Sequence, residues 1–264
     1  MCSSDLRTRP NPPAFLGVKT YQIKFRSNDS ENKPIAAITT ILVPFNKKAN
    51  GPLLSFQHIV NAVGLECAPS RVLWTQDPNL TIREAPALNV VLQQGWTVSI
   101  PDHLGPRSSY GAAKLGGQIS LDAITATQNF KPAGVKYSKV GLAGYSGGGM
   151  ATAWAAALAP KYSPKLNIVG AAYGGVPMDL IKMAEGLGYN RPHPAFGLAF
   201  AAAIGLAREY SDKVTLFDYL SPKGKRMFSE MRNACTNDVL RIGAGHSARR
   251  SEEHTSELQS RQSI

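Results

Sequence analysis

The chain has 264 residues, of which 43% are hydrophobic and 18% are charged, and its formal net charge is +11. This size fits one large α/β domain with a small inserted subdomain. The basic residues are scattered and gather only in short clusters such as Lys47-Lys48 and Arg249-Arg250, so we expect no nucleic-acid binding. The charge could instead assist transient contact with an anionic lipid interface. No run of about 18 apolar residues occurs, so we expect no transmembrane helix.

Strand-like and helix-like patterns alternate through the first two thirds of the chain. Residues 20–25 and 34–43 flank a turn and are expected to form a hairpin at a sheet edge. The further expected strands are 53–57, 96–100, 140–144 and 166–173, and the expected helices are 85–94, 118–130 and 151–159. This alternation predicts an α/β fold, with a mainly parallel sheet covered by helices on both faces.

The composition changes after Pro177. Residues 178–207 are rich in small and apolar residues, are interrupted by Pro192 and Pro194, and predict short helices, while 213–234 is more polar and helical. In a hydrolase, such an insertion would form a lid over the pocket. We therefore expect a core over 7–177 and a helical lid over 178–240; the alternative is a set of ordinary core helices.

The stretch Gly144-Tyr145-Ser146-Gly147-Gly148 joins an expected strand to an expected helix. A serine at the tip of such a strand–turn–helix fits the G-x-S-x-G nucleophile elbow of α/β-hydrolases, in which small neighbours let strand and helix approach. The alternative is a phosphate-binding turn. The absence of a G-x-G-x-x-G or G-x-x-x-x-G-K-[ST] pattern from the chain speaks against that alternative.

Polar residues follow several of the expected strands. Gln57, His103, Ser146 and Gly174 each lie at or just after a strand's carboxyl end. In parallel sheets the active site lies at that edge, so these residues could converge.

Six segments of the sequence together resemble the secretory lipase family of the lipase A type, within the α/β-hydrolases. They run in the family's order over roughly 21–240 and are Leu54-Ser55-Phe56-Gln57, Cys67-Ala68-Pro69-Ser70, Pro101-Asp102-His103-Leu104-Gly105-Pro106, Gly144–Gly148, Ala151-Thr152-Ala153-Trp154-Ala155 and Gly174-Gly175-Val176-Pro177-Met178-Asp179-Leu180. The resemblance implies secretion and hydrolysis of carboxylic esters, above all triacylglycerols. It implies no metal and no organic cofactor, and no pair of cysteines has metal-ligand spacing.

The resemblance also implies roles for particular residues. Ser146 falls on the family's nucleophile, and the backbone N–H of Gly147 on one donor of the oxyanion hole. The family's second donor is an acidic residue; the aligned position here is Asn61, which can donate without needing a protonated carboxyl group. The alternative for Asn61 is a turn-forming loop residue. A family disulfide implies that Cys67 pairs with Cys235, which requires an oxidising compartment; the alternative for each is a buried free thiol.

A serine nucleophile needs a base and an acid, which follow it in the order Ser, Asp or Glu, His in this fold. Downstream of Ser146, the candidate bases are His193, inside the expected lid, and His246. In the family both partners lie well past the lid, so we expect neither in this chain and little esterase activity from it. Among the remaining candidates, we expect Asp179 and Asp218 to lie in the lid or in loops. We expect Asp102 and His103 to lie at the pocket floor or in a loop.

The two ends of the chain look foreign. Residues 250–260 match the translation of a common sequencing adapter, and Cys2-Ser3-Ser4-Asp5-Leu6 matches its other strand. We therefore expect 1–6 and 250–264 to be non-native, and 7–249 to be a fragment whose truncated sheet exposes an edge and favours aggregation. The alternative is a disordered polar tail. Met1–Pro13 does not resemble a signal peptide, but truncation could have removed one.

Three other functional interpretations stay open. The chain could be an α/β-hydrolase acting on another acyl substrate, such as an esterase, peptidase or acyltransferase. It could be a non-catalytic binding module with a hydrolase fold. It could also be a doubly wound protein that binds phosphate at the turn after Ser146.

Overall fold

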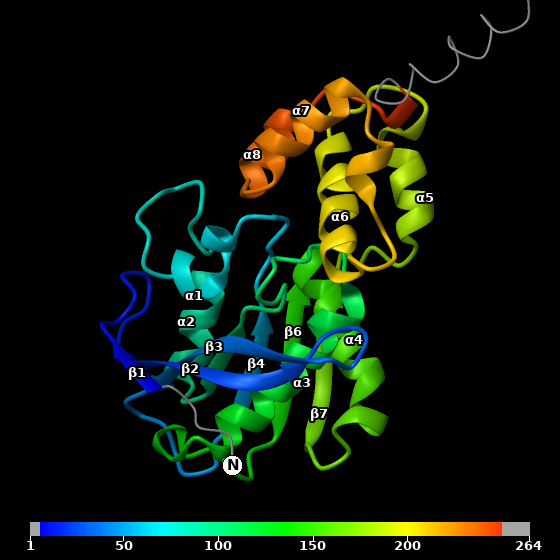
Figure 1. Cartoon of the computed structure of the whole chain (residues 1–264). Helices are drawn as coiled ribbons and strands as arrows, with labels where there is room; N and C mark the ends of the chain where they lie inside the picture. The colour runs from blue at the N-terminus through cyan, green and yellow to red at the C-terminus, as the bar shows by residue number, and fades with distance from the viewer. Residues whose placement is uncertain (1–5, 250–264) are drawn as a thin grey trace, which may run out of the picture. The chain divides into compact units, whose positions relative to one another are not determined.

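The computed structural model describes residues 6–249. Seven strands form one sheet in the order β1-β2-β3-β5-β4-β6-β7 (Figure 1). β5, β4, β6 and β7 run parallel to one another, while β1, β2 and β3 add antiparallel strands at one side. The strands are β1 Leu6–Arg9, β2 Val18–Asn28, β3 Pro34–Pro44, β4 Leu53–Gln57, β5 Thr97–Pro101, β6 Val140–Tyr145 and β7 Ile168–Gly174.

The expected hairpin is confirmed and is longer than its sequence pattern indicated. β2 and β3 pair along eleven residues each, and the Asp29 carboxylate closes their turn by accepting from the N–H groups of Glu31 and Lys33. The sequence did not indicate β1, because four residues rich in arginine carry no strand pattern. β1 lies outside β2, so the hairpin is one strand in from the edge.

Helices cover both faces of the sheet, as the alternating pattern predicted. On one face, Leu88 and Leu92 of α2 pack with the buried strands β4 and β5. On the other face, Leu121 and Ile124 of α3 pack with Val140 of β6. The helices of this part are α1 Pro69–Val72, α2 Ala85–Gln93, α3 Ala113–Asn129 and α4 Gly147–Tyr162, with short 3-10 turns at Leu65–Cys67 and Lys131–Ala133.

α3 and α4 approach each other very closely. A Cβ atom at Gly117 of α3 would lie 2.9 Å from the Trp154 carbonyl carbon of α4. Figure 1 shows the two helices side by side, with α4 running back along β6 and β7. α3 begins at Ala113 rather than near residue 118, because tertiary packing there outweighs the poor helix propensity of Gly116 and Gly117.

β7 is the exposed edge of the sheet. It pairs with β6 only, within residues 6–249, and five of its seven residues are exposed, including Val169 and Tyr173. Several of its apolar residues are exposed, although α4 lies along the strand.

The chain divides into two compact units. The second consists of Asn61–Leu65, Arg107–Gly111 and the described residues from Pro177 onward, and the first contains the remaining described residues. The second unit has its own apolar core, which includes Phe196, Phe200 and Met231. Its helices are α5 Leu180–Ala184, α6 Phe196–Glu209, α7 Pro222–Met231 and α8 Thr236–Gly243, with turns at Glu185–Tyr189 and Leu216–Tyr219. The expected short helices are thus present; α8 was not predicted.

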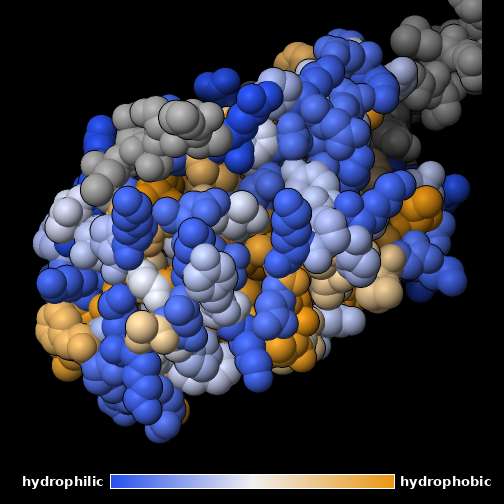
Figure 2. All heavy atoms as spheres, turned by 90° about the horizontal axis from the view of Figure 1, so that it is seen from below, coloured by the Kyte–Doolittle hydropathy of each residue, from blue (hydrophilic) through white to orange (hydrophobic). Residues whose placement is uncertain are grey.

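Figure 2 shows hydrophilic residues over much of the face seen from below, with separate hydrophobic areas between them. None of the helices within 6–249 has the length and apolar character needed to cross a bilayer.

Candidate active site

Ser146 lies at a strained turn between β6 and α4. Its φ and ψ are 54° and −121°, and positive φ is uncommon for a residue with a side chain. The Ser146 N–H donates to the Gly174 carbonyl at the end of β7, at 2.9 Å. The side chain is partly exposed, and no hydrogen bond of its hydroxyl is found within the described part of the chain. The turn therefore presents an accessible serine hydroxyl at the carboxyl edge of the sheet.

Three glycines allow this turn to pack against its neighbours. A Cβ at Gly148 would lie 2.0 Å from the Gln57 carbonyl oxygen, and one at Gly149 would lie 2.5 Å from the Gly174 carbonyl oxygen. A Cβ at Gly144 would lie 2.6 Å from the Gly148 carbonyl oxygen. Each glycine is required because backbone occupies the space of its side chain.

A buried hydrogen-bond network supports the elbow from below. The Thr152 hydroxyl of α4 lies 2.7 Å from Gln57 Oε1 and 2.9 Å from the Gly148 carbonyl oxygen. Gln57 Nε2 donates to Ser55 Oγ at 2.8 Å. The network fixes the first turns of α4 to the end of β4. The sequence placed Gln57 near the site but gave no indication of its partner Thr152.

Gly147 is the first residue of α4 and is buried. The first amides of a helix have no intrahelical acceptor and lie at the positive end of its dipole. The Gly147 N–H is therefore suited to stabilise an oxyanion formed at Ser146.

Asn61 belongs to the second compact unit, in the segment Asn61–Leu65. It is buried, and its Oδ1 atom has no hydrogen-bond partner among residues 6–249. Buried amide oxygens are usually paired, so an unpaired one is consistent with a site that binds something else.

Other titratable groups cluster after β4 and β5 in the first unit. His58 Nδ1 lies 2.9 Å from Glu84 Oε2. Burial opposes ionisation of Glu84, but the hydrogen bond and the charge of His58 lower the pKa of Glu84 overall. Asp102 accepts from the Ser70 hydroxyl at 2.5 Å and the Ser70 N–H at 2.8 Å, which ties α1 to the end of β5.

The pKa values of Asp102 and of the fully buried His103 are shifted in opposite directions. Burial raises the pKa of Asp102 to about 6, against the hydrogen bonds from Ser70 and the charge of Arg71. Burial and the nearby His58 lower the pKa of His103 to about 4. The folded state thus favours the protonated Asp102 and the neutral His103.

We predict that two variants reveal opposite pH dependences of stability. The contribution of Asp102 is present below its unfolded pKa of 3.8 and is lost as pH rises through about 6, while that of His103 grows as pH rises from about 4 to 6.5. In the unaltered protein, these two opposite changes of the free energy of unfolding with pH largely cancel. Asp102→Asn should leave a free energy of unfolding that rises by roughly 3 kcal/mol between pH 4 and 6.5, and His103→Leu one that falls by a similar amount. Urea unfolding across this range measures both, and equal slopes in the two variants would contradict the assignment.

His193 and His246 lie in the second unit and pair with each other through their backbones. The His193 N–H donates to the His246 carbonyl at 3.0 Å, and His193 Nδ1 accepts from the Ala195 N–H at 3.0 Å. Asp179 caps the start of α5, and Asp218 lies in the turn Leu216–Tyr219, as expected of lid or loop residues. His193 therefore serves the local backbone geometry before α6.

Cys67 and Cys235 are both disulfide-bonded. The free-thiol alternative is thus wrong for these two residues, whereas Cys2 lies outside the described residues. Within residues 6–249, no group of His, Cys, Asp and Glu is arranged to hold a metal ion.

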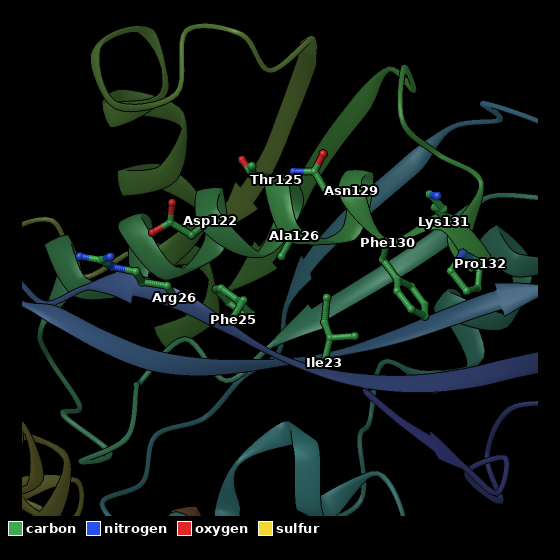
Figure 3. Close-up of a pocket in the computed structure, with 10 residues that line it drawn as sticks. All are labelled: Ile23, Phe25, Arg26, Asp122, Thr125, Ala126, Asn129, Phe130, Lys131 and Pro132. Atoms are coloured by element: carbon green, nitrogen blue, oxygen red, sulfur yellow. The ribbon is translucent and has the colours of Figure 1, made fainter. Parts of the chain in front are cut away.

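A cavity of about 490 Å³ lies away from the elbow, between β2 and α3 (Figure 3). Ile23 and Phe25 of β2 face Ala126 and Phe130. Arg26 and Lys131 lie toward opposite ends of the cavity in this view. None of its lining residues belongs to the elbow, so we do not assign it to the chemistry of Ser146.

Comparisons with known proteins agree with this geometry. A sequence model of the secretory lipase family matches residues 79–261. A secreted triacylglycerol lipase of Malassezia restricta is 35% identical over 249 residues, covering 89% of this chain and 52% of that protein. A protein of Mycobacterium tuberculosis named a probable inactive lipase is 32% identical, covering 91% of this chain and 56% of that protein. The chain spans about half the length of the curated relatives it matches.

Among solved structures, Candida antarctica lipase A in its closed state superimposes with a TM-score of 0.87 at 28% identity, covering 97% of this chain and 60% of that one. The expected α/β-hydrolase fold is thereby confirmed.

Proposed function

The chain belongs to the secretory lipase family, and on that premise we propose that it carries the nucleophile of a carboxylic ester hydrolase. The observation that carries the proposal is the elbow, in which Ser146 is held at positive φ between β6 and α4. Residues 7–177 would serve as the hydrolase core, and residues 178–240 as its helical lid. The proposed chemistry uses side chains and backbone alone, without a metal or cofactor.

The proposed reaction begins with attack of Ser146 Oγ on the ester carbonyl. The carbonyl oxygen becomes an oxyanion, which the Gly147 N–H and the Asn61 amide stabilise as donors. A base takes the Ser146 hydroxyl proton during the attack and passes it to the departing alkoxide, which leaves as the alcohol. The same base then deprotonates a water, which hydrolyses the acyl-serine to release the acid, and the proton returns to Ser146. The role of Asn61 rests on the family resemblance, in which an acidic residue stands at this position.

Triacylglycerol is the proposed substrate, and secretion the proposed destination of the protein. Several relatives are named secreted triacylglycerol lipases. The apolar, small-residue helices from Pro177 onward suit transient contact with a lipid interface and an acyl chain. A disulfide is also consistent with an oxidising compartment.

We propose that the catalytic acid and base are not among the described residues. His58 and His103 both precede Ser146, the wrong order for the base in this fold, and His103 is also fully buried with its pKa lowered to about 4. His193 and His246 hydrogen-bond to each other through their backbones. On this proposal, no residue within 6–249 activates Ser146 as its base.

The test measures the reactivity of Ser146 separately from the turnover of an ester substrate. A fluorophosphonate probe should label this chain slowly at Ser146, and Ser146→Ala should abolish labelling; p-nitrophenyl butyrate should be hydrolysed only at the background rate. A longer gene product, in which this chain is extended at its C-terminus to the full length of its relatives, should hydrolyse the ester, again dependent on Ser146. Rapid turnover by this chain, lost in Ser146→Ala, would contradict the proposed absence of the base and direct attention to His193 and His246.

A second candidate is a non-catalytic protein with a hydrolase fold. The similarity to a relative named a probable inactive lipase favours keeping it. Failure of the longer gene product to react with the fluorophosphonate would support this candidate and reject the ester hydrolase.

A further inference from the structure

Arg208, in the last turn of α6, joins three separate segments of the second unit. Its Nη1 donates to the carbonyl oxygens of Val63, at 2.5 Å, Arg107, at 3.0 Å, and Ser108, at 3.3 Å. Its Nη2 donates to the carbonyl oxygen of Arg232 at the end of α7. All of these acceptors are backbone carbonyls, so the side chain fixes the course of the chain.

The Asn61–Leu65 segment depends on such outside partners. The N–H groups of Val63 and Gly64 both donate to the Ala234 carbonyl, at 3.1 and 3.2 Å. The Ser108 hydroxyl lies 3.4 Å from the Gly64 carbonyl oxygen. The Val63 side chain is buried in the apolar core of the second unit. The segment is therefore held by the helical unit at both its backbone and its side chain.

Arginine is suited to this position by its chemistry. A guanidinium carries five N–H donors in a planar, rigid fork and accepts nothing. Burial and the charge of Arg232 lower the pKa of Arg208, but a guanidinium remains charged at every accessible pH. A lysine ammonium could reach one of these carbonyls but cannot hold the same fixed arrangement.

The next residue strengthens the same junction. The buried Glu209 carboxylate pairs with Arg107 Nη2 at 3.3 Å. The end of α6 thus holds Arg107–Gly111 through two side chains, but reaches Asn61–Leu65 through Arg208. An experiment on Asn61–Leu65 can therefore distinguish the role of Arg208 from that of Glu209.

We propose that Arg208 is a positioning residue for Asn61. By fixing the Val63 carbonyl to the ends of α6 and α7, it makes the segment that carries Asn61 move together with the helical unit. The proposal rests on the proposed role of Asn61 as an oxyanion-hole donor. It implies that a displacement of α6 also displaces this donor.

The first experiment measures amide hydrogen exchange in the 264-residue chain. Arg208→Met should increase exchange of the Val63 and Gly64 amides at least about tenfold, while amides within α6 and α8 keep their protection. Arg208→Lys should give an intermediate increase. Arg241→Met is the matched control, because Arg241 makes an exposed ion pair with Asp238 on α8, and it should change nothing at Val63.

Exchange patterns decide between positioning and general stability. A residue that only stabilises the unit would raise exchange throughout α6–α8, and this pattern in Arg208→Met would overturn the proposal. Unchanged protection of Val63 and Gly64 would overturn it as well. Hydrogen exchange needs no catalytic activity, so it reports on the contacts of Arg208 whether or not the chain reacts with esters.

The second experiment measures inactivation by a fluorophosphonate in the longer gene product. Arg208→Met should lower the inactivation rate constant about tenfold with little change in the probe concentration for half-saturation, because the lost alignment affects the oxyanion rather than binding. Asn61→Ala should give a similar loss, and the double variant no further loss. Additive losses would overturn the coupling of Arg208 to Asn61. If the unaltered protein is not labelled at all, the proposed function fails, and the exchange result decides the positioning role alone.

Discussion

Gly148→Ala is expected to destabilise the first unit by about 3 kcal/mol or more, or to prevent its folding. The new Cβ would lie 2.0 Å from the Gln57 carbonyl oxygen and 2.8 Å from the His58 carbonyl oxygen. Both contacts are with the backbone at the end of β4, which cannot rotate away as a side chain would. Relief requires α4 to move away from the sheet, which also breaks the hydrogen bond between Thr152 and Gln57. Urea unfolding followed by circular dichroism measures the loss.

Gly170→Ala is the matched control for this prediction. A Cβ at Gly170 in β7 meets no atom within 4 Å, and its φ is not positive. The substitution should be neutral or stabilise by up to about 1 kcal/mol, because it reduces the freedom of the unfolded chain. An effect of Gly148→Ala as small as that of Gly170→Ala would contradict the close approach of α4 to β4.

Local sequence pattern was sufficient for the core of the fold. β4 matches its predicted bounds, because a central parallel strand is a short apolar run bounded by Gly51-Pro52 on one side and a polar loop on the other. The elbow was predictable for a related reason, since only glycines permit a strand, a serine and a helix to meet so closely. Both features are encoded within a few consecutive residues.

The missed features depend on partners far away in the sequence. Thr152 is recognisable as a support of the elbow only when Gln57, 95 positions earlier, lies against it. Arg208 is one of many basic residues until its four acceptor carbonyls come together. Spacing within a single segment carries no information about such contacts.

The boundary between the two units also escaped local reasoning. Asn61–Leu65 follows the end of β4 after three intervening residues, so its sequence position assigns it to the core, but the structure groups it with the helical unit. Buried Val63 and the hydrogen bonds to Ala234 explain why, because both place the segment in the second unit's own packing.

Loss of the disulfide is expected to lower the free energy of unfolding by about 3–5 kcal/mol, if Cys67 and Cys235 pair as we propose. Both residues are disulfide-bonded, and they are the only cysteines within residues 6–249. They are 168 positions apart, and closing so long a loop removes much of the conformational freedom of the unfolded chain. The predicted effect is therefore near the upper end of what one disulfide provides.

Urea unfolding with and without dithiothreitol measures this contribution. The midpoint of the unaltered protein should fall on reduction, whereas the double variant Cys67→Ala/Cys235→Ala should unfold at the lower midpoint in both conditions. Peptide mapping without reductant should recover a linked pair that contains Cys67 and Cys235. If both thiols react freely with a maleimide in the native protein, or if reduction leaves the midpoint unchanged, the pairing contributes nothing to stability.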